Sequence, residues 1–158
     1  MARAQPVPTL DCGDSFTIAA AKVVSTRAAE VFELRYGVLD TGDVERLHDM
    51  RVATRRLRAV LEIFAPCFPR RAHRTVLRDV KLLADALGAR RDPDVQIAAL
   101  ASHAAQAPAA DRRGVEFLVD RLRREQSVAN AALSRALAEA ERSDLRGRLQ
   151  ALVEEARA

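Results

Sequence analysis

The chain has 158 residues, only 4% of them aromatic and none of them Trp, and its formal net charge at pH 7 is +4. This length is sufficient for one domain with a hydrophobic core, and abundant Ala, Leu, Arg and Glu beside few strand formers predict an all-α fold. Two cysteines are too few for a disulfide framework, and neither a signal peptide nor an apolar run of membrane-spanning length is present, so we expect a cytoplasmic protein.

The first third of the chain predicts a tail and two helices. Residues 1–13 show no hydrophobic period, so we expect a disordered tail followed by a helical domain over residues 14–158. A first helix is predicted to begin near Asp14 or Ser15, either of which could be its N-cap, and to run to about Leu39. Asp43 is a suitable N-cap for a second helix that ends near Pro66.

The remainder predicts four more helices, over about residues 69–87, 92–106, 108–142 and from 145 onward. Gly88 is a typical residue for ending a helix, while Asp92 and Pro93 are typical of the first turn of the next one. Ser143 or Asp144 is expected to cap the last helix. The short connections favour an antiparallel helical bundle of about five to six helices.

The second predicted helix carries two stripes at helical spacing. Its apolar stripe is Leu47, Met50, Thr54, Leu57, Leu61 and Phe64, and the neighbouring stripe is His48, Arg51, Arg55, Arg58 and Glu62. Arg56 lies further round. From His48 to Arg58 the basic stripe spans roughly 15 Å at the helical rise. A row of guanidinium groups of this length suits an extended polyanion better than a small ion.

The third predicted helix repeats this pattern with Arg71, Arg74, Arg78, Lys81 and Asp85. Residues 46–91 contain twelve Lys or Arg against four Asp or Glu, which gives +8, whereas the rest of the chain is −4. Such clustering favours an anionic partner. Charge rows are more often solvated faces with ordinary ion pairs, for which Asp49, Glu62, Asp79 and Asp85 are available.

Two motifs together resemble the CHAD family (conserved histidine α-helical domain). They are His48-x-x-Arg51-Val52-x-x-Arg55-Arg56-Leu57-Arg58 and, after Lys81, Leu87-Gly88-x-x-Arg91-Asp92-x-Asp94-Val95. The resemblance implies an all-α fold of two similar bundles with basic residues lining a groove, and binding of inorganic polyphosphate, often at polyphosphate granules. The implied anion contacts are His48, Arg51, Arg55, Arg56 and Arg58, joined by Lys81, Arg78 and Arg91. Arg74 is added because it lies in the same stripe as Arg78.

The resemblance covers roughly residues 15–158 and matches the first half of the usual two-half family pattern. His73 and His103 do not lie in a second motif, and Arg121-Leu122-Arg123-Arg124 lacks the histidine. A homodimer that completes the groove is therefore a hypothesis.

The sequence does not predict an enzyme. It contains no nucleophile–base pair, no Gly-rich phosphate loop and no metal-ligand spacing, so we expect neither a cofactor nor a metal. Two alternatives remain. The arginine stripe could serve a nucleic-acid-binding module, although few aromatic residues are available for base stacking. It could also serve a helical protein-interaction module that uses the helix over residues 109–142.

Overall fold

The computed structural model describes residues 3–157, which contain α-helices and no strand. The helices are α1 (Phe16–Leu34), α2 (Val44–Ile63), α3 (Arg70–Ala104), α4 (Ala109–Arg142) and α5 (Leu145–Glu155), with a short 3-10 helix, η1 (Ala65–Cys67), before α3. The predicted all-α class is confirmed, with five α-helices in the described part of the chain.

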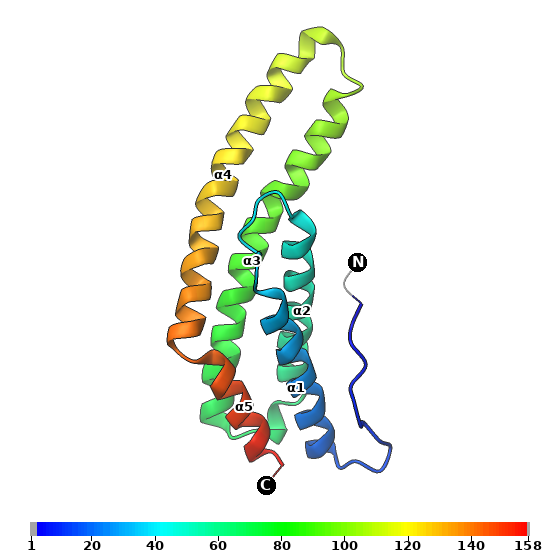
Figure 1. The fold of residues 1–158 in the computed structure, drawn as a ribbon, viewed down its shortest axis with the longest axis vertical. Helices are drawn as coiled ribbons and strands as arrows, with labels where there is room; N and C mark the ends of the chain where they lie inside the picture. Colours follow the sequence, from blue (N-terminus) through cyan, green and yellow to red (C-terminus); the bar gives the residue numbers. More distant parts are fainter. Residues whose placement is uncertain (1–2, 158) are drawn as a thin grey trace.

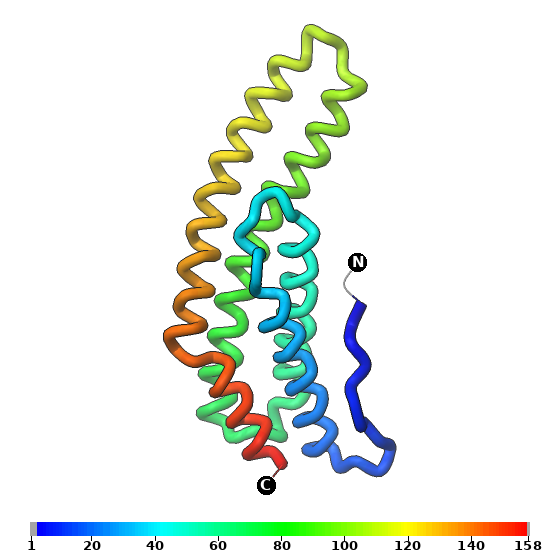
Figure 2. Tube along the Cα trace, in the orientation of Figure 1, coloured from blue at the N-terminus to red at the C-terminus, as the bar shows by residue number. Residues whose placement is uncertain are grey.

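The helices form a body and an arm. In the body, α1, α2, α5 and the adjoining halves of α3 and α4 lie side by side around one apolar core, to which each of these helices contributes (Figure 1). The far halves of α3 and α4 continue past the other helices as an antiparallel hairpin, and the tube shows this arm most plainly (Figure 2). Only these two helices pack against each other there.

Side chains cap three helices where the sequence predicts it. Ser15 accepts a hydrogen bond from the Ile18 N–H at 3.2 Å, Asp43 from the Arg46 N–H at 3.0 Å and Asp144 from the Gly147 N–H at 3.0 Å. Each bond satisfies one of the N–H groups that lack a partner within the first helical turn.

The first helix ends at Leu34, five residues before the predicted end at Leu39. Gly37 has φ +75°, a left-handed conformation that glycine adopts without the cost other residues incur. The residues from Arg35 onward therefore form the turn into α2.

The predicted break between a third and a fourth helix is wrong. Gly88, Asp92 and Pro93 all lie inside α3, which runs without interruption for 35 residues. Asp92 is an exposed mid-helix residue and not an N-cap, and there is no helix N-terminus here to face an anion.

Buried polar contacts explain why α3 continues through Pro93. Arg90 and Asp94 are both buried and form an ion pair one turn apart. From α4, Gln126 donates to Asp94 at 2.6 Å and Asn130 accepts from Arg90 at 3.1 Å. Asn130 also donates to the Leu39 carbonyl at 3.0 Å. This network fixes the helix where local preference would end it, since tertiary context overrides propensity.

Residues 3–13 contain no helix and lie along α1. The Arg27 guanidinium donates to the Gln5 carbonyl at 2.6 Å, and the Lys22 ammonium donates to the Thr9 carbonyl at 2.6 Å. Lys22 also pairs with Asp14 at 2.7 Å. These bonds connect the segment before the first helix to the body.

Gly88 offers a direct test of the continuous α3. A Cβ atom at Gly88 would meet nothing within 4 Å, and the residue is helical, so Gly88→Ala should stabilise the fold by about 0.5–1 kcal/mol. Thermal and chemical denaturation followed by circular dichroism would measure this. If Gly88 instead ended a helix in the left-handed conformation, the same substitution would destabilise the protein.

Candidate functional site

The basic stripe of α2 lies on the outside of the bundle. Leu47, Met50, Thr54, Leu57 and Leu61 are buried in the core, as the sequence predicts. The neighbouring side chains are consequently at the surface: Arg55 is exposed, and His48, Arg51 and Arg58 are half-buried. We call these four residues the α2 row.

A second basic row follows α3. Val76, Val80, Leu83 and Leu87 are buried, which leaves Arg71, Arg74 and Arg78 exposed and Lys81 half-buried. We call these four basic residues the α3 row. A surface hollow of about 660 Å³ is lined by Arg70, Arg71, Arg74, Thr75, Leu77, Arg78, Lys81 and Leu82. Arg70 was not singled out from the sequence, although its spacing of four residues from Arg74 would have placed it on the same face.

Glu62 connects the two rows. Its carboxylate accepts from the Arg58 Nε at 3.2 Å on its own helix and lies 2.9 Å from the Lys81 Nζ on α3. The contact with Lys81 is the main cause that lowers the pKa of the Glu62 carboxyl from its ordinary value. Burial opposes this effect, and the contact with Arg58 lowers the pKa further. Cations from two helices therefore converge on one carboxylate at the surface.

Several other cations of the rows have no acidic partner. Within residues 3–157, the side chains of His48, Arg51, Arg55 and Arg74 form no ion pair or hydrogen bond. Arg78 pairs with Asp79 at 3.1 Å, and Asp79 is shared with Arg148 of α5 at 2.8 Å. The expected neutralisation by ion pairs thus involves Glu62 and Asp79 but leaves much of the α2 row unneutralised.

Two predicted contact residues, Arg56 and Arg91, belong to neither row, and each lines a hollow of its own. Arg56 lines a separate hollow that contains one further arginine, Arg3, but three carboxylates. These carboxylates, of Glu30, Glu33 and Asp49, disfavour binding of an anion there. Arg91 lies beside the first turn of α2, one turn before His48, where its Nη1 is 3.5 Å from the Val44 carbonyl.

The histidine of α3 has a structural environment. The His73 side chain is buried, its Nε2 lies 2.8 Å from the Leu61 carbonyl, and its ring stacks on Phe68 with 6.0 Å between centroids. His73 thus connects the end of α2 to the start of α3 and helps to fix the register in which the two rows lie.

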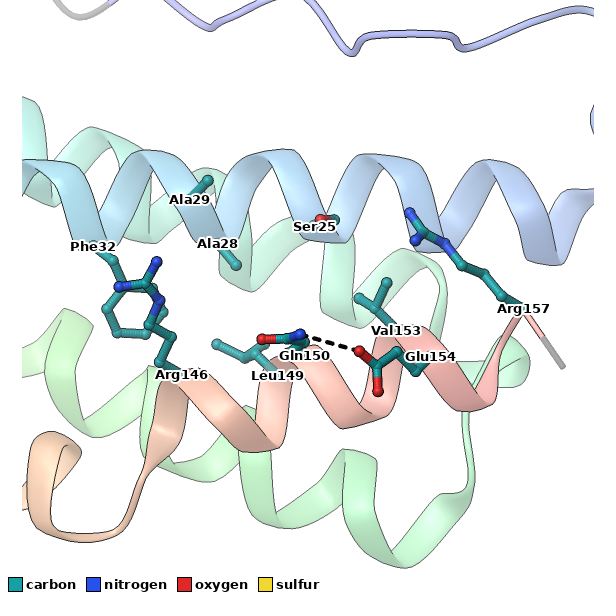
Figure 3. A pocket seen from close by; sticks show the side chains of 10 residues that line it. All are labelled: Ser25, Ala28, Ala29, Phe32, Arg146, Leu149, Gln150, Val153, Glu154 and Arg157. Atoms are coloured by element: carbon teal, nitrogen blue, oxygen red, sulfur yellow. Dashed lines mark hydrogen bonds between the residues drawn. The ribbon is translucent and has the colours of Figure 1, made fainter.

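A further hollow, of about 240 Å³, lies between α1 and α5 (Figure 3). There Arg146 lies over the Phe32 ring at 5.7 Å, and Gln150 donates to Glu154 at 3.0 Å. Arg157 lines the same hollow. None of these residues belongs to either basic row, so this hollow is separate from the candidate anion surface.

No group of three or more His, Cys, Asp or Glu side chains within residues 3–157 is arranged to hold a metal ion. The same residues include no helix that is both long and apolar enough to cross a membrane.

Comparison with known protein families shows a match to the CHAD domain over residues 23–158. The chain belongs to the CHAD family. The match covers nearly the whole chain, including both basic rows and the arm. No curated protein and no solved structure matches the chain. CHAD domains are associated with polyphosphate-related proteins, which gives the basic surface a chemical context.

The bridge at Glu62 leads to a testable pKa change. Because Lys81 makes the larger contribution, Lys81→Ala should raise the pKa of Glu62 toward the ordinary glutamate value, and Arg58→Ala should raise it less. Carbon-13 NMR of the Glu62 carboxyl across an acid titration would measure both. Since the pKa is lowered by folding, the small stabilisation from this bridge is present above the unfolded pKa and lost as the pH falls through the folded one. An unchanged Glu62 titration in Lys81→Ala would refute the bridge.

Proposed function

We propose that this CHAD protein binds inorganic polyphosphate on the surface formed by the α2 and α3 rows, without turnover. The main support is the Glu62 carboxylate, which cations from both helices already contact at 2.9 and 3.2 Å. Side chains of α2 and α3 can therefore reach a single anionic group between them. A phosphate chain presents such groups at regular intervals along its length.

The proposed contacts are His48, Arg51, Arg55 and Arg58 of the α2 row and Arg74, Arg78 and Lys81 of the α3 row. Unpaired arginines on an exposed helix face repel one another, and a bound polyanion would remove that repulsion. Binding would also release the counterions condensed on the polyanion, so affinity should fall steeply with salt. Arg56 and Arg91 have a smaller role in this proposal, because each lines a different hollow.

Binding without catalysis is proposed because the sequence lacks a nucleophile–base pair and a Gly-rich phosphate loop. Positioned charges are sufficient to hold a polyanion, whereas phosphoryl transfer requires in-line positioning of a nucleophile and stabilisation of a developing charge. The protein would then act where polyphosphate accumulates, at granules in the cytoplasm.

Single-stranded nucleic acid is the second candidate ligand of the same arginines. The exposed aromatic side chains are Phe16, Tyr36 and Phe117, and none of them lies in either row. Phe16 packs against Phe64 with 5.1 Å between ring centroids. Without aromatic platforms among the cations, base stacking cannot contribute the affinity typical of single-strand binders. Competition between polyphosphate and DNA at equal phosphate content distinguishes the two ligands.

Removing two unpaired cations tests the surface. Arg51→Ala combined with Arg55→Ala should weaken binding of long-chain polyphosphate at least tenfold, since each charge-assisted contact is worth roughly 1–3 kcal/mol, non-additively. The slope of affinity against salt should also become shallower. Isothermal titration at two salt concentrations measures both effects.

The matched control is Arg112→Ala with Arg113→Ala, which removes the same charge from exposed positions at the start of α4. It should change affinity far less. Equal losses in both double variants would mean that net charge alone, and not this surface, determines binding.

Glu62 should act as an internal competitor of the polyanion. Glu62→Gln removes the carboxylate that neutralises Arg58 and Lys81, so binding should tighten on the order of fivefold, in keeping with the modest strength of exposed ion pairs. Asp85→Asn is the control, because it removes the same charge from the stripe that contains the α3 row, and Asp85 has no ion pair within the described residues. If both substitutions tighten binding equally, competition at Lys81 and Arg58 is ruled out.

A further inference from the structure

Four of the ten large apolar side chains that are exposed within residues 3–157 lie on α3 and α4 in and next to the arm. Val95 is 51% exposed, Phe117 65%, Leu118 45% and Val128 71%, and all four lie on the two helices of the arm. In the body, α2 and α5 pack against α3, and α5 packs against α4, but the arm beyond consists of α3 and α4 alone (Figure 1). Exposed apolar side chains on a two-helix arm are candidates for an interaction surface.

One face of α4 carries this apolar surface together with opposite charges. Leu118, Arg121, Glu125 and Val128 step by three, four and three residues, so they lie on one side of the helix. All four are exposed. We call these residues the α4 stripe. A hollow of about 500 Å³ adjoins it, with Leu118, Arg121, Leu122 and Glu125 on one side and Gln96, Ala99 and Leu100 of α3 on the other.

The α4 stripe is complementary to itself when reversed. In an antiparallel pair of identical helices related by a twofold axis, a residue that lies a given number of positions before the axis faces a residue of the second copy. That facing residue lies the same number of positions after the axis. With the axis at Arg123, Leu118 faces Val128 of the second copy, and Arg121 faces Glu125 of the second copy. Both apolar residues then meet apolar residues, and both charges meet opposite charges.

The complementarity continues outward with the same axis and the same heptad spacing. One heptad before Leu118 is Asp111, and one heptad after Val128 is Arg135, so these two exposed residues face each other with opposite charges. Gly114 and Ala132 face each other in the same way, and their small size permits close approach of the helices. The four pairs at this spacing are thus each matched in charge or in size: Asp111 with Arg135, Gly114 with Ala132, Leu118 with Val128, and Arg121 with Glu125.

We propose that two copies of this chain associate antiparallel through α4, with the twofold axis near Arg123. A second copy is the favoured partner because the stripe supplies its own complement, which an unrelated partner would have to match by coincidence. The apolar pairs and the hollow beside them provide burial, while the paired charges fix the register, as polar residues do in coiled-coil seams.

The existing ion pair on the stripe does not prevent this association. Arg121 and Glu125 contact each other at 3.2 Å along one helix, and their side chains are 66% and 53% exposed. Such an exposed pair contributes little to the stability of the isolated helix. Both side chains can therefore exchange this contact for one with the second copy. The association uses no residue of the α2 or α3 row, so it stands or fails independently of polyphosphate binding.

The test is sedimentation velocity of the full chain without polyphosphate, over a concentration series. The wild type should form a concentration-dependent dimer. Arg121→Glu and Glu125→Arg should each bring like charges together at two places in the dimer and shift the protein to monomer. An equimolar mixture of the two variants should form a heterodimer. In that mixture the introduced glutamate of the first variant faces the introduced arginine of the second, and the native Glu125 of the first faces the native Arg121 of the second.

The mixture separates the proposal from effects within one helix. Each single variant loses its internal ion pair, and mixing cannot restore it, so recovered association requires contact between chains in this register. Circular dichroism of each variant checks that helix content is retained. A wild type that remains monomeric at several hundred micromolar, a dimer unaffected by the single reversals, or a mixture that stays monomeric would each overturn the proposal.

Discussion

The buried pair of Arg90 and Asp94 is the interaction on which the rest of the molecule depends. Gln126 and Asn130 of α4 bind this pair, and Asn130 also reaches the Leu39 carbonyl before α2. The network thus connects three separate parts of the chain: α3, α4 and the turn before α2. One nitrogen of Arg90 and one oxygen of Asp94 remain without a hydrogen-bond partner within the described residues, so the network is not fully compensated. Removing either charge would leave the other buried alone, which is much more costly than the net gain of the intact pair.

The consequences of this network extend in both directions along α3. Toward the body, α3 packs antiparallel to α2, so the two basic rows face solvent from adjacent helices and meet at Glu62. Away from the body, α3 continues beyond the start of α2 and supports α4 as an arm (Figure 2). A break at Gly88, as local preference favours, would have separated these two halves and left the direction of the arm undetermined. The length of α3 therefore positions both surfaces that we propose to be functional.

The sequence predicts features that depend on neighbouring residues and misses those that depend on distant ones. Caps such as Asp43 and apolar stripes such as that of α2 follow from local hydrogen bonding and helical periodicity, and the structure confirms them. The course of α3 at Pro93 could not be predicted, because it depends on residues of α4 more than thirty positions away. The sequence identifies Glu62 and Asp79 as acids available for ion pairs. It does not predict that Glu62 connects α2 to α3 or that Asp79 connects α3 to α5. The helix over residues 109–142 was considered as a protein-interaction module, but the self-complementary α4 stripe on it was not recognised from the sequence.

Dimerisation through α4 would strengthen the binding of polyphosphate to the α2 and α3 rows. An antiparallel dimer presents two copies of the α2 and α3 rows on one rigid particle. A polyphosphate chain long enough to reach both copies binds the second at a high effective concentration, whereas a shorter chain occupies one copy and gains nothing from dimerisation. Preference for long chains would then arise from the spacing between the two bodies and not from any contact within one of them. In this arrangement the basic rows determine which polymer binds, and the arm determines the chain length that binds best.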